Sequence, residues 1–278
     1  MTNNQANNPE RERPTPPTSE AIQKLERAKK VIETFQKRPE LPANFELEPI
    51  LERSQALYNF LNLKVDLKSE LDQELIELPT RELIESAPQL NLDDIIIVSS
   101  QVSREELIQA VDEKLKSQGV EQGLFLSDQA RQDLNQTLAS QDRPAKGYFL
   151  FFSSNLDCRQ SLPQSKGKSA KDIINQLIPQ LRQEQPNLNL RGLRLEEYLL
   201  IDSLANQERN QHLDSNSYCW LTEELIPARQ GNETLCLLAR WHGSLGVHSL
   251  LVSGVHPEDG ARLAAVSLPE RSGAQSRA

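Results

Sequence analysis

The side chains best suited to metal binding or nucleophilic chemistry are gathered in the second half of the chain. The cysteines and histidines lie at Cys158, His212, Cys219, Cys236, His242, His248 and His256. Zinc sites are usually built from close pairs such as C-x2-C or H-E-x-x-H, and the chain contains neither. A site made of His242, His248 and His256 is conceivable, but histidines spread over turns more often face solvent. We therefore expect no metal site.

The cysteines could also act as nucleophiles or form disulfides. Cys158 follows Asp157 in a polar stretch, without a glycine turn that could supply an oxyanion hole. Cys219 and Cys236 each lie in an apolar run, which indicates buried and unreactive thiols. Three cysteines are too few for a disulfide scaffold. Neither G-x-x-x-x-G-K-[ST] nor G-x-G-x-x-G occurs, so we expect no catalytic residues and no cofactor.

The composition restricts the class of partner. The chain has 278 residues, of which 37% are hydrophobic, and a formal net charge of -9. Its length allows a sizeable core, and its acidic balance disfavours nucleic acid and anionic membranes as partners. No stretch approaches the roughly 18 apolar residues that cross a bilayer, and the first residues lack the apolar core of a secretory signal. We expect a cytoplasmic protein.

The chain changes character along its length. No glycine precedes Gly119, whereas both tryptophans and all four histidines lie in the last third. This contrast predicts an α+β protein, with a mainly helical N-terminal region that carries two short strands and a C-terminal domain of two helices and a small antiparallel sheet. The expected parts are a disordered tail (1–18), a helical region (19–90), a small α/β region (91–160), a C-terminal domain (169–270) and a flexible tail (271–278).

Caps and apolar spacing predict the individual elements. Two helices are expected over residues 19–38 and 47–61. Three more should begin after the cap residues Ser103, Ser127 and Ser169, and a last one should start within residues 193–200. Ser103 and Glu106 have the spacing of a capping box. The expected strands are 92–98, 147–152, 218–222, 234–241, 247–252 and 261–268. The first two helices either pack on each other or form a docking or oligomerisation arm.

Three segments of the last third carry a resemblance to a known fold. They are GLRLEEY at residues 192–198, SYCWL at 217–221, and LARWHG at 238–243 with GARLA at 260–264. They resemble, in turn, the helix entry, the central aromatic strand and the closing strands of the C-type-lectin-like fold. That fold is shared by formylglycine-generating-enzyme relatives and by the variable proteins of diversity-generating retroelements. The match covers about residues 190–270, lacks the Pro-Thr of the helix entry, and has Ala261 where the family has an aromatic residue.

The resemblance implies a rigid scaffold with a diversifiable face. Diversity in such proteins arises at template adenines, mostly in AAY codons, which mutate only to NNY codons. NNY codons cannot encode Lys, Glu, Gln, Met or Trp, and residues 242–257 contain none of these, although apolar strands avoid charged residues anyway. The expected ligand-binding residues are His242, Ser244, Leu245, His248, Leu250, Val252 and His256. The expected scaffold residues are Trp220, Arg240, Trp241, Gly260, Arg262 and Leu263.

The predicted function is therefore recognition of another protein inside the cell, without catalysis. The C-terminal domain would bind this ligand, and the N-terminal helices would bind a further partner or a second copy of the chain. The oxidases of the same superfamily use a closely spaced pair of catalytic cysteines, which Cys219 and Cys236 do not form. The alternative is a structural or signalling adaptor that acts through helix-mediated assembly and is not diversified.

Overall fold

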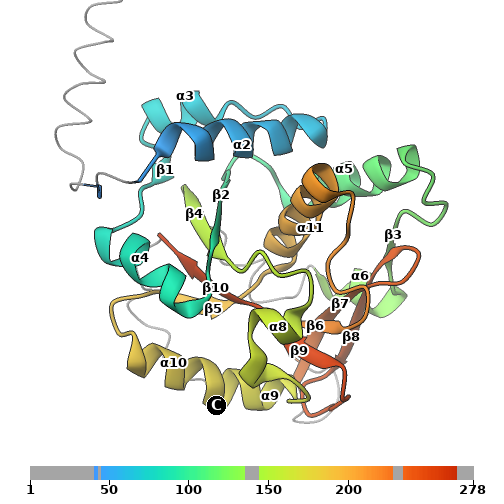
Figure 1. The fold of residues 1–278 in the computed structure, drawn as a ribbon. Coiled ribbons are helices and arrows are strands. Elements are labelled where there is room, and N and C mark those ends of the chain that lie inside the picture. The colour runs from blue at the N-terminus through green and yellow to red at the C-terminus, as the bar shows by residue number, and fades with distance from the viewer. Residues whose placement is uncertain (1–40, 43–44, 135–143, 228–233, 268–278) are drawn as a thin grey trace, which may run out of the picture. The chain divides into compact units, whose positions relative to one another are not determined.

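Residues 41–42, 45–134, 144–227 and 234–267 are described by a computed structural model (Figure 1). They belong to one compact unit that begins at Leu41. The expected helix over 19–38 and the expected tails at 1–18 and 271–278 lie outside these residues. Within them, no helix combines the length and the apolar character needed to cross a membrane.

The first sheet is built around β4 (Gly147–Phe152), a strand that is buried at every position. β2 (Asp94–Val98) pairs antiparallel along one edge of β4. On the other edge, β1 (Ile76–Glu77) pairs parallel with the start of β4, and β10 (Leu263–Val266) pairs antiparallel with its end. β5 (Leu190–Gly192) pairs with β10. Strands from the expected regions 19–90, 91–160 and 169–270 therefore share one sheet.

The second sheet has the order β3-β8-β7-β6-β9. Its centre is an antiparallel meander of β6 (Tyr218–Pro227), β7 (Thr234–Trp241) and β8 (Leu245–Leu251). The short strands β3 (Leu124–Leu126) and β9 (Asp259–Ala261) pair parallel with β8 and β6. The strand expected over 261–268 is in fact divided, because the chain passes from the second sheet to the first at Arg262, between β9 and β10.

The helices form where the caps predict them. Ser103 and Glu106 complete a capping box, and Ser127 and Ser169 each accept a backbone hydrogen bond from the first turn they open. The α-helices are α2 (Leu47–Phe60), α3 (Leu67–Asp72), α4 (Arg81–Ser86), α5 (Arg104–Ser117), α6 (Asp128–Asp133), α8 (Cys158–Ser161), α9 (Ala170–Asp172), α10 (Ile178–Glu184) and α11 (Leu195–Arg209). A π-helical turn (Ile173–Leu177) joins α9 to α10, and 3-10 turns lie at Ala87–Leu90 and Pro163–Ser165. The described fold is α+β.

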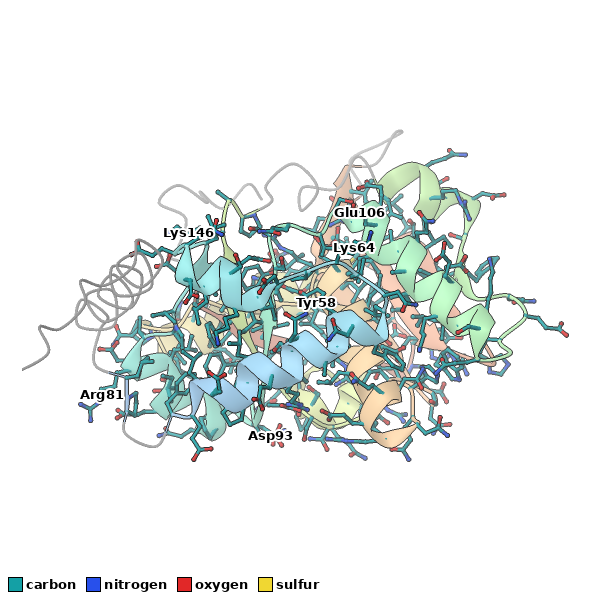
Figure 2. The ribbon with its side chains drawn as sticks, turned by 90° about the horizontal axis from the view of Figure 1, so that it is seen from above. Tyr58, Lys64, Arg81, Asp93, Glu106 and Lys146 are labelled. Carbon is teal, nitrogen blue, oxygen red and sulfur yellow. The ribbon has the colours of Figure 1, made fainter. Side chains whose placement is uncertain are left out.

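One helix covers the first sheet, and a second ties that helix to the rest of the molecule. α2 packs on β2, and Figure 2, which looks down on this helix, marks its residue Tyr58. The hydroxyl of Tyr58 donates to the carbonyl of Ile97 at 3.2 Å and accepts from the amide of Ser99 at 2.8 Å. α11 is buried along most of its length and packs against α2, α5 and β6. It therefore lies at the centre of the core that both sheets share.

A buried ionic network fixes the start of α11. The carboxylate of Glu197, which has no exposed surface, accepts from Arg191 Nη1 at 2.7 Å and from the amide of Arg194 at 2.8 Å. The hydroxyl of Tyr148 on β4 also donates to it. Burial alone would raise the pKa of Glu197, but the charge and hydrogen bonds of Arg191, aided by Arg194, lower that pKa to about 2. The network locks β4, β5 and α11 together.

Candidate functional site

The structure separates the predicted ligand-binding residues by exposure. His242, Leu250 and His256 are exposed, and Ser244, His248 and Val252 are half-buried. Ser244 Oγ lies 3.4 Å from Gln122 Oε1, and Val252 packs against the core. The exposed positions are therefore the ones that a ligand can reach without rearrangement of the sheet.

The prediction that Leu245 binds a ligand is wrong, because this residue has no exposed surface. It pairs with Leu124 on one side and Trp241 on the other. Side chains alternate along a strand, so residues 246, 248 and 250 of β8 share one face, and 245 and 247 point to the other. The predicted set combined both faces of β8.

The predicted scaffold residues also divide. Trp220, Gly260, Arg262 and Leu263 are buried, as a scaffold role requires. Arg240 and Trp241 are half-buried instead. As consecutive residues of β7 they lie on opposite faces of the second sheet, so each can contribute to a surface on its own side.

A row of aromatic and cationic side chains crosses the second sheet on the Arg240 side. Phe125 of β3 pairs with Gly246 of β8, which pairs with Arg240 of β7. Gly246 leaves a gap that the ring of His248 covers, since a Cβ at Gly246 would lie 3.3 Å from His248 Nε2. The rings of His248 and Phe125 have centroids 5.6 Å apart. Burial lowers the pKa of His248, which favours the neutral ring.

Arg240 is held beside the same row by Tyr218 of β6. Its guanidinium carbon lies 4.4 Å from the centroid of the Tyr218 ring, and Nη1 donates to the Tyr218 hydroxyl. Its Nε is buried without an acceptor among the described residues, and no carboxylate of that part of the chain pairs with it. Tyr218 in turn meets the exposed His256 edge to face, at 5.7 Å. We call this surface the β8 face and define it by Phe125, Tyr218, Arg240, His248 and Leu250.

Exposed apolar side chains gather at the same strands. Among the residues that the structure describes, the large apolar side chains that are exposed are Phe125, Leu250, Leu251 and Val255, with exposures between 42% and 61%. Phe125 lies on β3, Leu250 and Leu251 on β8, and Val255 in the segment that follows β8. Clustered exposed apolar side chains indicate an interaction surface, whereas single ones scattered over a surface are common and carry no such meaning.

A polar pocket of about 410 Å³ lies on the other side of β7. Its lining includes Asp157, Asn210, Asn216, His212 and Trp241. The rings of His212 and Trp241 stack with centroids 3.5 Å apart and planes 6° from parallel. His212 Nδ1 lies 3.0 Å from Oδ2 of the buried Asp202, which orients the ring. We call this the Trp241 pocket.

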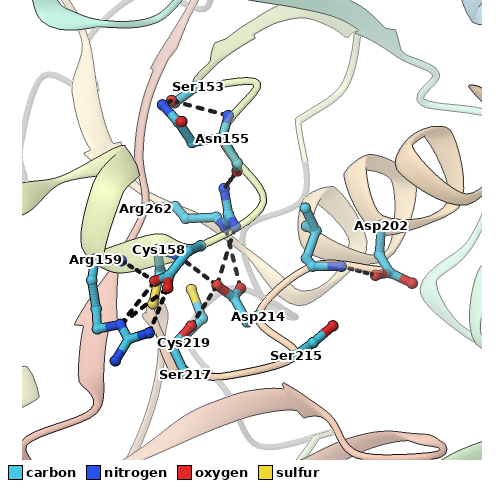
Figure 3. A network of polar contacts seen from close by, with 12 residues as sticks. Ser153, Asn155, Cys158, Arg159, Asp202, Asp214, Ser215, Ser217, Cys219 and Arg262 are labelled. Carbon is cyan, nitrogen blue, oxygen red and sulfur yellow. Dashed lines mark hydrogen bonds and ion pairs between the residues drawn. The ribbon is translucent and has the colours of Figure 1, made fainter. Parts of the chain in front are cut away.

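Cys158, Asp214 and Cys219 form the one grouping in the described ranges with ligand atoms close enough to hold a metal, within 4.8 Å of one another. Figure 3 shows why the carboxylate is already occupied. Arg262 donates to both oxygens of Asp214, at 3.2 Å and 3.1 Å. The amide of Cys158 donates to the same carboxylate at 2.6 Å, as does the hydroxyl of Ser217 at 3.1 Å. A cation here would face the Arg262 guanidinium.

The thiols of this group have the properties of core side chains. The hydrogen bond with Cys219, followed by burial and by the Asp214 charge, raises the pKa of the Cys158 thiol well above its usual range. A protonated thiol is a poor metal ligand and a poor nucleophile. Burial likewise raises the pKa of Cys236. The cluster therefore joins the segment around Asp214 to α8 and to the crossing between the sheets.

Sequence reasoning missed several residues of these surfaces. Phe125 lies in the apolar run Leu124-Phe125-Leu126, in which the structure buries the two leucines and exposes the phenylalanine. The apolar run could have indicated a short strand, although neither the exposure of Phe125 nor the pairing with β8. Nothing in the sequence links His212 to Asp202 or to Trp241. The first contact depends on how the chain turns after α11, and the second depends on the return of β7 past the end of that helix.

The chain matches no family model, no curated protein and no solved structure.

Proposed function

We propose that the protein is a non-enzymatic binding protein that recognises a protein partner through the β8 face. The observation that carries this proposal is that Phe125 and Leu250, two of the large apolar side chains that are exposed among those described, lie on this face together with Arg240. Interfaces concentrate binding energy in aromatic residues and arginine inside an apolar surround. Phe125, Tyr218 and Arg240 supply these residue types side by side.

The proposal includes a C-type-lectin-like domain with a diversifiable face. It is supported by the order of elements after residue 169, namely α9 to α11 followed by the antiparallel meander of β6, β7 and β8. It is also supported by the exposure of His242, Leu250 and His256, whose side chains can change without disturbing the core. Leu245 does not belong to that set.

Site-specific photo-crosslinking tests the binding surface. A photoreactive residue replaces Leu250 in the full chain, and a matched control carries it at Lys68, an exposed residue of α3. Both variants are expressed in the cells that make the protein, and the captured proteins are identified by mass spectrometry. We expect one partner to be captured from position 250 and not from position 68. Equal capture from both positions would contradict the proposal.

The captured partner is then purified and its affinity measured. Leu250→Asp should weaken binding about tenfold or more, because it buries a charge in the interface, whereas Lys68→Asp should have little effect. If a second copy of this chain is the captured species, the adaptor alternative is favoured. If Leu250→Asp binds as tightly as the unchanged chain, the β8 face is not the interface.

Diversification has a separate test in the surrounding DNA. The segment that encodes residues 235–268 should have a second copy nearby, beside a reverse-transcriptase reading frame. The two copies should differ mainly where the second has adenine. Absence of such a copy would remove diversification from the proposal and leave the binding surface to the crosslinking experiment.

A further inference from the structure

We propose that the partner of the β8 face presents a carboxylate to Arg240, from an aspartate or glutamate flanked by apolar residues. This inference rests on the proposed function, and it names the chemistry of the partner at that site. Arg240 supplies the charge, and Phe125, His248 and Leu250 supply apolar surface next to it on the same face of the sheet.

The first argument is the pairing of arginines elsewhere in the described ranges. The buried Arg104, Arg191 and Arg262 each contact a carboxylate, and so do the half-buried Arg53 and Arg159. The exposed Arg182 and Arg209 donate to backbone carbonyls instead. Arg240 is half-buried in a chain of net charge -9, yet its polar partner among the described residues is the hydroxyl of Tyr218. A partly desolvated guanidinium is stabilised by a carboxylate, and the described residues do not provide one.

The second argument is preorganisation. Tyr218 holds the guanidinium by stacking at 4.4 Å and by its hydroxyl, so Arg240 loses little side-chain freedom when a ligand binds. The Nε remains without an acceptor among the described residues. A planar guanidinium group fixed in this way can donate two parallel hydrogen bonds to the two oxygens of a carboxylate.

The third argument concerns the charges around Arg240. His248 faces it from β8 with a pKa lowered by burial, so its ring is neutral at neutral pH. Beyond Tyr218 lie His256 and Asp259, and Asp259 accepts the His256 amide at 2.9 Å. Burial raises the pKa of Asp259. The site thus presents one permanent cation in an apolar setting, which fits a single carboxylate. A polyanion fits less well, since the protein's net charge of -9 repels it.

A random peptide library displayed on phage, with the peptide C-termini blocked by the coat protein, provides the probe. The full chain is the bait, and Leu250→Asp and Lys68→Asp chains are run in parallel. We expect the unchanged chain and Lys68→Asp to enrich peptides with an Asp or Glu at one fixed position between apolar residues. Leu250→Asp should not enrich them.

A double-mutant cycle on one enriched peptide then isolates the contact. Changing the peptide Asp to Asn should weaken binding to the unchanged chain about ten- to a hundredfold. The same peptide change should hardly alter the affinity for the Arg240→Gln chain. The peptide change does not depend on the folding of any protein variant. Arg240→Gln is checked separately by its thermal unfolding.

The outcomes separate this inference from the proposed function. If the enriched peptides are apolar but carry no selected acid, and Leu250→Asp fails to enrich them, the role of Arg240 is overturned and the β8 face is retained. Acidic peptides that bind Arg240→Gln as tightly as the unchanged chain would also overturn it. Absence of any enrichment, or enrichment that Leu250→Asp does not change, would overturn both proposals.

Discussion

Arg262 and Asp214 form an ion pair inside the protein, with Arg262 Nη2 and Asp214 Oδ1 3.1 Å apart and side-chain exposures of 2% and 0%. Arg262 is the residue at which the chain leaves β9 and enters β10, and it also donates to the carbonyl of Asn155 at 2.6 Å. Asp214 has a φ of 52°, in the left-handed region that non-glycine residues seldom adopt. The pair therefore holds a conformationally unfavourable segment against the junction of the two sheets.

Removal of one charge from this pair should destabilise the protein strongly. In Asp214→Asn the Arg262 guanidinium stays buried without its counter-ion, which typically costs about 3–5 kcal/mol in the free energy of unfolding. Urea unfolding followed by circular dichroism measures the loss. Glu85→Asn serves as the control, because its i,i+4 pair with Arg81 is exposed, and this change should cost no more than about 0.5 kcal/mol. Equal losses in the two variants would contradict a structural role for the buried pair.

Glu197 should make the protein sensitive to acid. Its pKa falls from an ordinary value of 4.5 to about 2 on folding, so the unfolded chain binds a proton first as the pH decreases. The stabilisation is complete above about pH 4.5 and is lost progressively as the pH falls towards about 2. Urea unfolding at several pH values in this window should show a steeper fall for the unchanged chain than for Glu197→Gln. Parallel curves would show that Glu197 does not contribute. At neutral pH the variant should be the less stable protein, since Arg191 loses its partner.

Gly192 should tolerate a methyl group only if Thr222 is shortened. A Cβ at Gly192 would lie 1.7 Å from Thr222 Oγ1, so the first sheet approaches the second at a distance that only glycine allows here. Gly192→Ala should therefore cost about 1–3 kcal/mol in the free energy of unfolding. Thr222 Oγ1 is buried without a hydrogen-bond partner among the described residues, so Thr222→Ala should cost little. The double variant should be more stable than Gly192→Ala alone. Additive losses would contradict the proposed contact.

The thiols should react only when the protein opens. Cys158, Cys219 and Cys236 are each 0% exposed, and the pKa values of Cys158 and Cys236 are raised well above the usual range. A thiol reagent such as a disulfide-containing chromophore attacks the thiolate, so both burial and protonation slow the reaction. We expect no release of chromophore from the native chain and release for all three thiols in denaturant. Rapid reaction of a thiol under native conditions would show that this part of the core is accessible.

Local signals predicted the elements that depend on a few neighbouring residues. The Ser103–Glu106 capping box and the Ser169 cap each start a helix at the expected residue, because the side chain satisfies amides of the helix it opens. β4 was predicted because its apolar run can only be buried. The two- and three-residue strands β1, β3 and β5 were not predicted, since each becomes a strand by pairing with a distant partner.

The errors in the candidate site have the same origin. The window 242–257 contains the exposed Leu250 and His256, but its composition could not distinguish the two faces of β8, and Leu245 is on the buried one. Arg240 and Trp241 were expected only as scaffold because their surroundings on opposite sides of β7 come from Tyr218 and His212, which precede β7 in the chain. Exposure and cross-strand neighbours are tertiary properties, which strand periodicity alone does not determine.

The position of β10 beside β4 has a consequence for synthesis on the ribosome. The hydroxyl of Ser267 donates to the carbonyl of Glu77, a contact between residues 190 positions apart, at the point where β1, β4 and β10 meet. While translation proceeds, β4 emerges long before β10, so its apolar edge stays unpaired until residues 263–266 have also been made. Such nascent chains expose surface that aggregates or recruits chaperones. A transcript truncated before the codons of β10 should therefore yield a chaperone-bound or insoluble product rather than a shorter folded protein.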